Sequence, residues 1–521
     1  AYTQQKKNKD IPEGGAKGVI LLEPFTLVKG DSNLLEQEMK YAKVDKSVIT
    51  DKIKNYKEKM KLEFLYSSQR SYVSTLLSLI NCDENEKLRA VEIIDYWKKP
   101  EYIYLGPDEN MHNDMITWIA DYSAYVGYKP GKSFISSKPM TGINHKEYGV
   151  TSFGVNTYMH QTLLFLGIDP EKTPFTVKIS GGPDGDVAGN QIKNLHKFYR
   201  NTAKVVAITD VSGTIYDPDG LDLDILLTLF NKAQSIRHYP AELLHDEGFL
   251  LDLQTVKEEK SYQKLTLCYS KKNGKLIEDY ISGNDMHHIF KTNVHHAIAD
   301  VFIPAGGRPK TLNKNNYTDF LDENGSPSSK AIVEGANLYL TSFARKKYQE
   351  LGVLIIKDSS CNKGGVITSS MEVLSALVLN ENEFLENKEV LVSEILKFIE
   401  HICYKEARLI FDTFEETGEF LTDISDKISK KINQYKYEIL DYLESCKLSN
   451  NPDDPLITAL LQHCPPFLRN NYASKILENI PDIHKKAIIA VFIASNLIYE
   501  RGVFWKPSVT DILLDIAKKL T

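Results

Sequence analysis

The chain has few cysteines, and none of them lies in the spacing of a binding motif. Six cysteines occur among 521 residues, and no CxxC pair is present. Structural zinc sites and disulfide frameworks need paired or numerous cysteines, so the sequence predicts neither, and a reducing compartment fits best. His287-His288 and His295-His296 lack cysteine or carboxylate partners at metal-ligand spacing, so we predict no metal site.

Two further absences narrow the functional class. No apolar run approaches the roughly 20 residues that span a bilayer, so we expect no membrane partner. Lys and Arg number 63 against 70 Asp and Glu, whereas nucleic-acid-binding proteins are usually basic, so we expect no nucleic-acid partner. The chain begins without an initiator Met and shows no signal peptide. We therefore expect a cytoplasmic protein, or a mitochondrial one if the sequence is a fragment that has lost an N-terminal region.

The remaining composition is that of a folded protein with more than one domain. The chain is 42% hydrophobic, which is enough for packed cores. At roughly 150 residues per domain, its length predicts about three domains. Apolar residues recur at three- and four-residue spacing over residues 31–100, which predicts amphipathic helices, and another helix is expected over 111–127. The apolar runs 19–22 and 102–105 predict short strands.

From residue 175 to 360, β-branched runs alternate with helical stretches. This alternation predicts a parallel sheet with crossover helices, which makes the fold class α/β. Lys272-Asn273-Gly274-Lys275 predicts a hairpin turn between two further strands. After about residue 370 the pattern is helical, with Pro465-Pro466 as its main interruption. The expected strands of the sheet are residues 175–179, 205–209, 301–304, 332–333 and 353–356.

A glycine-rich segment follows the first of these strands. Residues 175–179 run directly into Ser180-Gly181-Gly182-Pro183-Asp184-Gly185-Asp186, and a helix-like segment comes next. Glycines at such a turn let the backbone approach a pyrophosphate at the helix N-terminus. Asp210 ends the next strand, 25 positions after Gly185, close to the spacing of an acid that binds a ribose 2′-hydroxyl. A carboxylate there repels a 2′-phosphate, so NAD is favoured over NADP.

The glycine-rich segment after residues 175–179, and a second one at residues 362–365, also have a plainer interpretation. The first turn has the spacing G-x-x-G-x-x-x-G and not G-x-G-x-x-G, and no P-loop lysine follows it. It could be an ordinary βα turn without a ligand. The second turn, Asn362-Lys363-Gly364-Gly365, could simply precede a helix that is capped by Thr368 or Ser369.

Two residues stand where catalytic groups are often found. Lys17 lies inside Gly14-Gly15-Ala16-Lys17-Gly18. A lysine held among glycines near apolar surface can serve in proton or carbonyl chemistry, although a lysine on a surface loop is the commoner case. Asp108 follows Gly106-Pro107 at a strand end, where catalytic carboxylates of α/β enzymes often lie. An aspartate that caps a turn or a helix is the plainer alternative.

Taken in order, these segments resemble the glutamate dehydrogenase family, and especially its large NAD-specific form. The resemblance covers about residues 3–375 and is much weaker afterwards. Several motifs in the right order are more specific than any one of them. The matching motifs are Ile11-Pro12-Glu13-Gly14-Gly15-Ala16-Lys17-Gly18, Gly106-Pro107-Asp108 followed by Trp118, Tyr148-Gly149-Val150-Thr151-Ser152, Gly182-Pro183-Asp184-Gly185-Asp186, Ser212-Gly213-Thr214-Ile215-Tyr216, Pro304-Ala305-Gly306-Gly307-Arg308-Pro309, Glu334-Gly335-Ala336-Asn337 and Asn362-Lys363-Gly364-Gly365-Val366.

The resemblance implies roles for individual residues. Lys17 matches the catalytic lysine, which activates water and polarises the substrate carbonyl, and Asp108 matches the acid/base that moves protons to and from the amino group. Asn362 matches a residue that lines the cleft between the domains, and Ser369 matches the position that holds the side-chain carboxylate of glutamate. The implied cofactor contacts are Thr151 at the nicotinamide amide, with Gly182, Asp184, Gly185, Asp186, Val187, Asp210 and Asn337. The family's other carboxylate-binding lysines lie upstream of the catalytic one, and this chain starts too late to contain them.

The resemblance implies an NAD-dependent enzyme that converts L-glutamate to 2-oxoglutarate and ammonia, and that forms a homo-oligomer. We expect a substrate-binding domain over residues 1–160, truncated at its N-terminus, and a Rossmann-like NAD-binding domain over 161–365. A helical C-terminal region over 366–521 is expected to complete the substrate domain in part. Two alternatives stay open: a dehydrogenase of leucine, valine or phenylalanine, and a catalytically silent NAD-binding scaffold.

Overall fold

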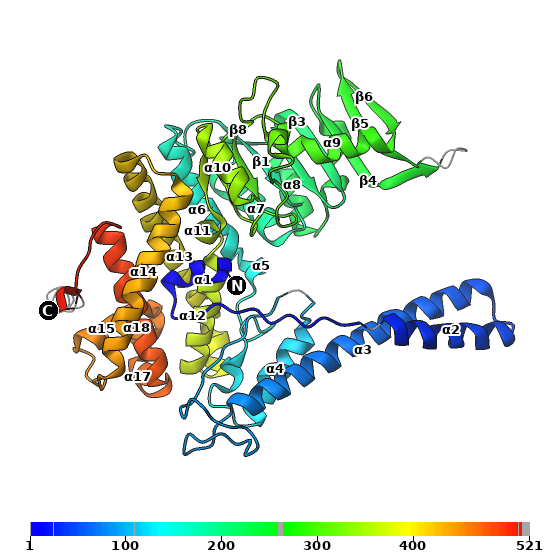
Figure 1. The fold of residues 1–521 in the computed structure, drawn as a ribbon. Helices are drawn as coiled ribbons and strands as arrows, with labels where there is room; N and C mark the ends of the chain where they lie inside the picture. The colour runs from blue at the N-terminus through cyan, green and yellow to red at the C-terminus, as the bar shows by residue number, and fades with distance from the viewer. Residues whose placement is uncertain (1, 24, 109, 259–263, 509, 513–521) are drawn as a thin grey trace. The chain divides into compact units, whose positions relative to one another are not determined.

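The structure is a computed structural model that describes residues 2–23, 25–108, 110–258, 264–508 and 510–512 (Figure 1). The chain divides into two compact units, which are described separately. Unit 1 consists of Ala1–Gly15, His145–Met371 and Asn387–Thr521, and unit 2 of Ala16–Asn144 and Glu372–Glu386. No helix in the described ranges combines the length and the apolar character needed to cross a membrane.

A mixed sheet forms the centre of unit 1, with nine strands in the part of the chain that the structure describes (Figure 1). The strand order is β6-β5-β4-β3-β2-β1-β7-β8-β9. β1 pairs in parallel with β2 and β7, and the sheet continues in parallel to β8 and β9. On the other side, β2 to β6 pair antiparallel. The strands are β1 Phe175–Ser180, β2 Ala203–Asp210, β3 Gly213–Leu221, β4 Phe249–Glu258, β5 Lys264–Lys272, β6 Lys275–Ile281, β7 Ala299–Pro304, β8 Ser329–Val333 and β9 Leu354–Ile356.

The five strands expected from the sequence are confirmed, and they form the parallel part of the sheet. Their β-branched side chains, such as Val177, Ile208 and Ile332, are fully buried because helices cover both faces of the parallel strands. The hairpin turn at Asn273 and Gly274 is also confirmed. Both residues have positive φ, at 50° and 73°, as the tightest hairpin turns require.

The expected parallel sheet is extended by an antiparallel half, β3 to β6, of which the sequence predicted the hairpin of β5 and β6 but not β3 and β4. β3 begins three residues after β2 ends, so the chain turns back on itself instead of crossing over through a helix. β3 could not be predicted from the sequence, because the second half of this strand contains Asp217-Pro218-Asp219, and Asp and Pro are depleted in strands.

The helical pattern expected after residue 370 is confirmed. α15 ends at His463 and α16 begins at Pro466, so one break falls at Pro465-Pro466, where proline suits the first turn of a new helix. It is not the main interruption, because the break between α14 and α15, over residues 445–454, is longer. The α-helices of unit 1, including two that extend into unit 2, are α1 Tyr2–Lys7, α5 His145–Tyr148, α6 Val150–Phe165, α7 Asp186–Tyr199, α8 Leu223–Asn231, α9 Gly283–His296, α10 Ser342–Glu350, α11 Asp358–Cys361, α12 Gly364–Val378, α13 Glu381–Thr417, α14 Leu421–Glu444, α15 Pro455–His463, α16 Pro466–Asn471, α17 Ala473–Asn479 and α18 Asp482–Arg501. The short 3-10 helices of this unit are η1 Asn8–Asp10, η3 Ile236–His238, η4 Ala241–Leu243 and η5 Tyr317–Phe320.

A buried ion cluster ties the N-terminal segment of unit 1 to its C-terminal helices. The cluster consists of Lys9, Asp10, Lys363 and Glu406, all at most 2% exposed. Glu406 of α13 accepts hydrogen bonds from Lys9 Nζ at 2.6 Å and from Lys363 Nζ, while Lys363 Nζ lies 2.7 Å from Asp10. Burial alone would raise the pKa of Glu406, but the charges of Lys363 and Lys9 lower it to about 2. Tyr499 of α18 donates to Asp10 from its hydroxyl group.

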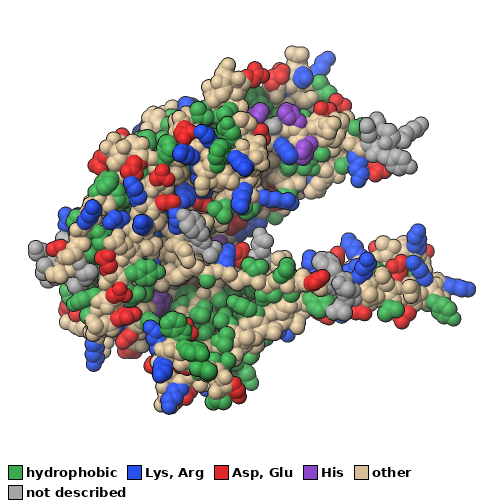
Figure 2. All heavy atoms as spheres, viewed as in Figure 1, with side chains coloured by type: hydrophobic (Ala, Val, Ile, Leu, Met, Phe, Trp, Pro, Cys, Tyr) green, Lys and Arg blue, Asp and Glu red, His purple; other side chains and the backbone are tan. Residues whose placement is uncertain are grey.

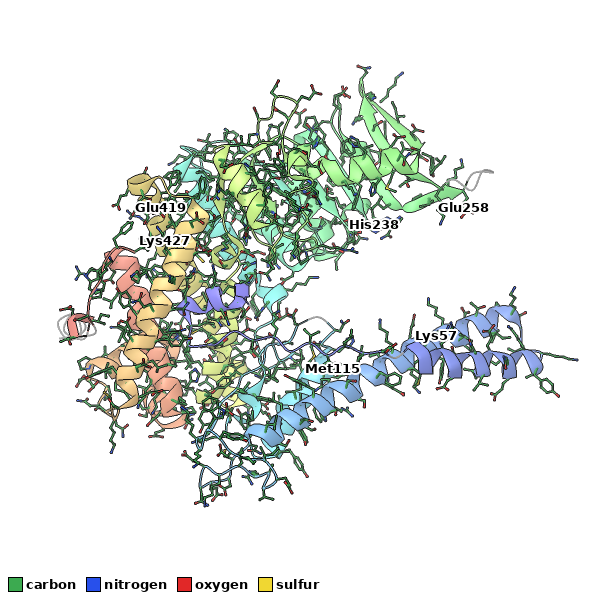
Figure 3. All side chains as sticks on the ribbon, in the orientation of Figure 1. Lys57, Met115, His238, Glu258, Glu419 and Lys427 are labelled. Carbon is green, nitrogen blue, oxygen red and sulfur yellow. The ribbon has the colours of Figure 1, made fainter. Side chains whose placement is uncertain are left out.

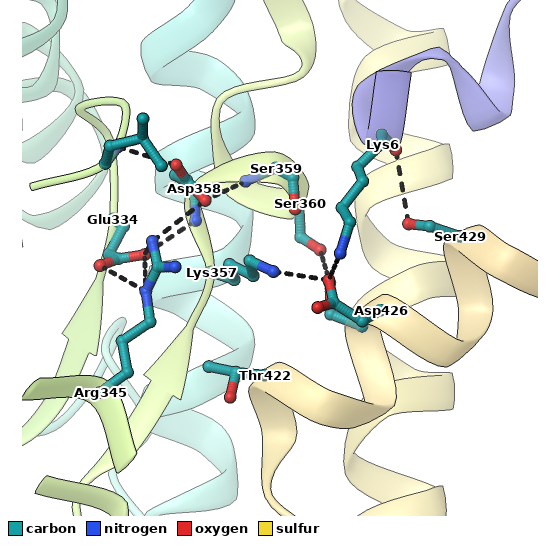
Figure 4. A network of polar contacts seen from close by, with 12 residues as sticks. Lys6, Glu334, Arg345, Lys357, Asp358, Ser359, Ser360, Thr422, Asp426 and Ser429 are labelled. Carbon is teal, nitrogen blue, oxygen red and sulfur yellow. Dashed lines mark hydrogen bonds and ion pairs between the residues drawn. The ribbon is translucent and has the colours of Figure 1, made fainter. Parts of the chain in front are cut away.

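A second polar network continues this connection (Figure 4). Asp426 of α14 accepts hydrogen bonds from Lys6 at 2.6 Å and from Lys357 at 2.5 Å. Beside it, Arg345 of α10 donates to Glu334 with two of its nitrogens and lies 3.2 Å from Asp358. The helical C-terminal region is therefore bonded through Asp426 to Lys357, directly after β9, and to Lys6 of α1.

Unit 2 is built on a long pair of helices. α2 (Phe25–Tyr41) lies along the first part of α3 (Lys46–Ile80), and α4 (Asn113–Tyr125) packs against the end of α3 (Figure 1). The apolar core joins Val73 and Leu77 of α3 to Ile119 of α4 and to Phe134 in the 3-10 helix η2 (Gly131–Phe134). Basic and acidic side chains are interspersed over the exposed part of the α2–α3 pair (Figure 2), and Lys57 of α3 is among them (Figure 3).

Of four expectations for unit 2, one is confirmed, one is confirmed in part and two were wrong. The helix expected over 111–127 is α4, with Met115 buried (Figure 3). The helices expected over 31–100 end at Ile80, because residues 81–100 form turns and bends. The runs 19–22 and 102–105 are extended but form no named strand. Leu105 makes a single bridge to Ile135.

Candidate functional site

The glycine-rich turn of unit 1 lies at the carboxyl end of β1. β1 ends at Ser180 and α7 begins at Asp186, with Gly185 as the residue that caps the helix. Gly181 has a φ of 104°, which favours glycine. A Cβ atom on Gly182 would lie 2.3 Å from Asp210 Oδ2 and 2.6 Å from Asp184 Oδ1, so this position has no room for a side chain. The predicted strand, turn and helix therefore exist, and glycine is needed for close approach.

Asp210 lies beside this turn, as the sequence spacing predicts. Its Oδ1 accepts hydrogen bonds from the backbone N–H groups of Ser212 at 2.7 Å and Gly213 at 3.1 Å, and its Oδ2 from Ile236 N at 2.8 Å. Burial raises the pKa of Asp210, and these hydrogen bonds oppose the rise. The carboxylate is thus held in a fixed orientation next to Gly182.

The remaining residues of the turn contact elements that precede it in the chain. Val187 O accepts a hydrogen bond from Ser152 Oγ at 2.7 Å, and Asp184 O accepts one from Lys146 Nζ at 2.8 Å. Burial raises the pKa of Asp186 in the first turn of α7, and the charge of Lys146 opposes it. Lys146 was not among the predicted site residues, and its position 38 residues before Asp184 gave no signal of this contact.

Thr151 lies in the first turn of α6, next to the start of α12. Gly149, with a φ of 64°, precedes α6, and the Cβ position of Gly365 lies 3.1 Å from Thr151 Oγ1. A Cβ on Gly364 would lie 2.2 Å from Val150 O. The Gly364-Gly365 pair therefore allows the N-termini of α6 and α12 to touch. Packing against α6 requires glycine at these two positions, whereas an ordinary turn, the plainer interpretation of the sequence, would not.

Two predicted residues far apart in the sequence meet in this unit. Asn337 Oδ1 accepts hydrogen bonds from Asn362 Nδ2 and from Lys7 Nζ, each at 2.9 Å. Asn362 Nδ2 also donates to Gly335 O, while Asn362 Oδ1 is buried with no hydrogen-bond partner. Sequence reasoning identified both asparagines but missed Lys7, which lies in the segment Lys6-Lys7-Asn8-Lys9 outside any motif.

Ser369 lies inside α12, so the alternative of a helix capped by Thr368 or Ser369 was wrong: the helix begins at Gly364. Ser369 Oγ lies 3.4 Å from His145 Nε2. Burial lowers the pKa of His145 to about 4, so this imidazole is neutral at pH 7. Burial also raises the pKa of Glu13 to about 7, although a hydrogen bond with Ser370 opposes the rise. Sequence reasoning assigned no role to His145 or Glu13, and only Glu13 lay within a quoted motif.

The predicted catalytic pair lies in unit 2. Lys17 Nζ and Asp108 Oδ2 form an ion pair although they are 91 positions apart in the sequence. Both side chains are about half exposed, at 51% and 61%, so they are accessible to a small molecule. The buried strand expected after Lys17 is not formed, and the following residues are exposed. A lysine and a carboxylate in contact can exchange protons with a bound substrate.

The chain is similar to several known proteins. Residues 142–408 match the family described as Glutamate/Leucine/Phenylalanine/Valine dehydrogenase. The chain is 32% identical to the probable NAD-specific glutamate dehydrogenase of Schizosaccharomyces pombe over 97% of its own length and 41% of that protein. It is 32% identical to glutamate dehydrogenase 2 of Dictyostelium discoideum, covering 96% of this chain and 43% of that one. The NAD-specific glutamate dehydrogenase of Saccharomyces cerevisiae is 30% identical over 96% of this chain and 42% of its own.

Solved structures are also similar to the chain. A hetero-hexameric glutamate dehydrogenase from Thermus thermophilus is 19% identical, with 69% of this chain and 65% of that one covered at a TM-score of 0.41. Glutamate dehydrogenase 2 of Plasmodium falciparum is 14% identical, with 85% and 68% covered at a TM-score of 0.41. The chain spans about two fifths of the length of the curated relatives it matches. Because the family match covers more than half of its residues, the chain belongs to the glutamate, leucine, phenylalanine and valine dehydrogenase family.

Proposed function

We propose that the chain carries the catalytic residues of an NAD-specific glutamate dehydrogenase. The reaction converts L-glutamate, NAD and water to 2-oxoglutarate, ammonia and NADH. The observation that carries the proposal is the ion pair of Lys17 and Asp108, which joins two motifs 91 positions apart into one acid–base pair. The names of the curated relatives support glutamate as the substrate and NAD as the cofactor.

Bound at the glycine-rich turn, NAD would supply the acceptor for the hydride of the substrate Cα. Asp108 first accepts a proton from the substrate ammonium group, so that the nitrogen lone pair can form the imine as the hydride leaves. Lys17 then activates a water molecule, which adds to the imine carbon. Asp108 returns its proton to the departing nitrogen, and ammonia leaves as the carbonyl of 2-oxoglutarate forms. The half-exposed position of both side chains leaves room for a substrate and a water molecule beside them.

The glycine-rich turn between β1 and α7 supports a dinucleotide site, because such a turn brings the backbone to a helix N-terminus where a pyrophosphate can bind. Glycine at position 182 lets the turn lie directly against Asp210, since a Cβ atom there would collide with that carboxylate. Asp210 is held by three backbone N–H groups and would accept a hydrogen bond from a ribose hydroxyl group. We assign the cofactor to this turn, with Thr151, Gly182, Asp184, Gly185, Asp186, Val187, Asp210 and Asn337 as its contacts.

Asn362 and Ser369 are the proposed substrate contacts. Asn362 Oδ1 is buried and unmatched, so it can accept a hydrogen bond from a bound ligand. Ser369 Oγ, beside the neutral ring of His145, is a hydrogen-bond donor for a carboxylate. A dehydrogenase of leucine, valine or phenylalanine would need an apolar contact at this position. The two possibilities are separated by measuring the activity of the wild-type protein and of Ser369→Ala with a panel of amino acids. If the variant loses activity with glutamate alone, the assignment of Ser369 is supported.

The test of the proposal is the variant Lys17→Ala in the intact protein. Glutamate-dependent formation of NADH should fall at least 1,000-fold, about 4 kcal/mol of transition-state stabilisation, while NADH binding stays within twofold. Lys57→Ala is the matched control, because Lys57 is an exposed lysine on α3 of the same unit. Turnover by Lys17→Ala equal to that of the control would refute the assignment. NADH binding without any turnover in the wild-type protein would favour the silent scaffold.

The wider organisation follows from the same proposal. We infer a substrate-binding domain over 1–160, an NAD-binding domain over 161–365 and a helical region over 366–521 that partly completes the first domain. We also infer a homo-oligomer, which the resemblance to the family implies, and a cytoplasmic or mitochondrial location. Measuring the molecular mass in solution tests the oligomeric state, and cell fractionation tests the location.

A further inference from the structure

The helical C-terminal region of unit 1 contains a cavity that is separate from the proposed site. Residues of α12, α13, α15 and α16 line it, and none of those that the structure describes is a proposed catalytic, cofactor or substrate contact. Its volume of about 330 Å³ lies within the range of about 300–1,000 Å³ that is usual for small-molecule sites. Much of its wall is apolar, formed by Met371, Ile395, Phe398 and Pro465-Pro466. The cavity therefore has the size and the wall of a site for a small organic molecule.

His463 lines this cavity, is almost fully buried and has no hydrogen-bond partner. The residue is 3% exposed, and neither ring nitrogen forms a hydrogen bond within the part of the chain that the structure describes. Phe398 and Phe492 meet the ring edge to face, with centroid distances of 5.8 and 6.1 Å, so packing fixes its orientation. Burial lowers the pKa of His463 to about 4, so the ring is neutral at pH 7. A neutral imidazole keeps one N–H donor, and a buried polar group without a partner is rare in folded proteins.

Two cationic side chains line the same cavity, and neither belongs to an ion pair. Lys397 of α13 and Arg469 of α16 form no ion pair or side-chain hydrogen bond in the described ranges. Glu394 also lines the cavity and accepts a hydrogen bond from Phe467 N at 2.9 Å. Burial lowers the pKa of His401, so this second imidazole adds no charge at pH 7. Two positive charges and one negative charge leave the described lining with one positive charge.

A cysteine lies beside His463, but the cavity is not a covalent site. Cys464 is 2% exposed, and its Sγ donates to Leu460 O at 3.4 Å. Burial raises the pKa of this thiol to about 12, and the charge of Arg469 opposes the rise. The thiol therefore stays protonated at pH 7 and is a poor nucleophile. Its response to Arg469 also shows that the guanidinium charge acts at the buried end of the cavity.

We propose that this cavity binds a small organic anion, namely a monocarboxylate with an apolar body. Arg469 and Lys397 attract the carboxylate, and the N–H group of His463 donates a hydrogen bond to it. The apolar body packs against Ile395 and Phe398. One negative charge balances the single positive charge of the lining, whereas a phosphate group with two charges would exceed it. The inference concerns the C-terminal helices and stands whether or not the proposed reaction is correct.

Calorimetric titration of the intact protein tests the chemistry of the ligand. The probes are hexanoate, with a flexible body, and benzoate, with a flat one, and each is compared with its own amide, which has the same shape and no charge. We expect at least one carboxylate to bind, and to bind at least tenfold more tightly than its amide. Failure of both carboxylates to bind, or equal affinity of acid and amide, would overturn the proposal. Tighter binding of inorganic phosphate would overturn it in favour of a phosphate site.

The variant Arg469→Gln tests whether the carboxylate binds in this cavity and not among the substrate contacts. It removes the guanidinium charge from a partly exposed side chain, so the affinity for the carboxylate should fall at least tenfold. His463→Phe keeps an aromatic ring but removes the N–H donor, and it should weaken binding at least threefold. Arg200→Gln is the matched control, because Arg200 is an exposed arginine of the same unit that pairs with Asp224. If Arg469→Gln binds the carboxylate as tightly as this control does, the anion is bound elsewhere and the proposal is wrong.

Discussion

Glu406→Gln should strongly destabilise unit 1, because it removes charge from the centre of the buried ion cluster while keeping the shape of the side chain. Lys9 and Lys363 would share Asp10 as the remaining carboxylate of the cluster, and all three are almost fully buried. Removing one partner of a buried ion pair costs about 3–5 kcal/mol, since the other charge stays out of water. Glu419→Gln is the matched control: Glu419 pairs with the half-exposed Lys427 (Figure 3), and such a surface pair contributes about 0–1 kcal/mol.

Urea unfolding measures this difference. Trp505 lies in unit 1 and reports on it by fluorescence when Trp97 and Trp118 of unit 2 are replaced by phenylalanine. With a slope of about 1–3 kcal/mol per molar urea, the midpoint for Glu406→Gln should fall by at least about 1 M. The midpoint for Glu419→Gln should stay close to that of the parent protein. Equal midpoints for the two variants would show that the buried cluster does not hold the N-terminal segment against the C-terminal helices.

Two other outcomes follow from the site. Gly182→Ala should weaken NADH binding at least tenfold, about 1.4 kcal/mol, because the new Cβ would lie 2.3 Å from Asp210 Oδ2; Gly283→Ala, which meets nothing within 4 Å, should leave binding unchanged in the same fluorescence titration. Because burial raises the pKa of Glu13 to about 7, the folded chain binds its proton more tightly than the unfolded chain does, so its stabilising contribution is complete below about pH 4.5 and is lost as the pH rises to about 7. Glu13→Gln should therefore flatten the melting temperature measured across this range, and an unchanged slope would contradict the raised pKa.

Much of the fold of unit 1 could be predicted from the sequence, because its parallel strands are buried on both faces and carry a strong local signal. The runs that became β1, β2, β7, β8 and β9 are short, β-branched and bounded by turns, and all five were identified. The antiparallel half was harder, since β3 contains Pro218 and two aspartates and depends on pairing with β2 and β4. Strand formation is settled by neighbours, which a local pattern does not contain.

In unit 2, a segment with a strand-like sequence forms no strand. Residues 19–22 have the composition of a strand, yet they form none in the described residues, because no neighbouring backbone is there to pair with them. Helices, whose hydrogen bonds are internal, were predicted more reliably, and α4 lies within two residues of its expected bounds. The end of α3 at Ile80 was missed because residues 81–100 retain apolar side chains, such as Val91 and Trp97, that are exposed instead of packed.

The candidate site could be predicted as a set of residues but not as a set of contacts. Local patterns singled out Lys17, Asp108, the turn at Gly182, Asp210 and Asn362, and the resemblance to a family added Asn337 and the roles. The structure brings Lys17 to Asp108, Gly182 to Asp210 and Asn337 to Asn362. Lys146 and His145 could not be found in this way, since their contacts with the turn and with Ser369 depend on the packing of α5, α6 and α12. These tertiary contacts leave no mark on the local sequence.

Hydride transfer from glutamate is the central claim, and isotope transfer tests it most directly. The intact protein is incubated with NAD and L-glutamate that carries deuterium at Cα, and the reduced nicotinamide is examined by mass spectrometry. The account predicts that one deuterium per turnover appears in NADH, that 2-oxoglutarate and ammonia form in equal amounts, and that Lys17→Ala forms neither. Reduced nicotinamide without deuterium, or no reduction with glutamate while leucine or valine is oxidised, would contradict it.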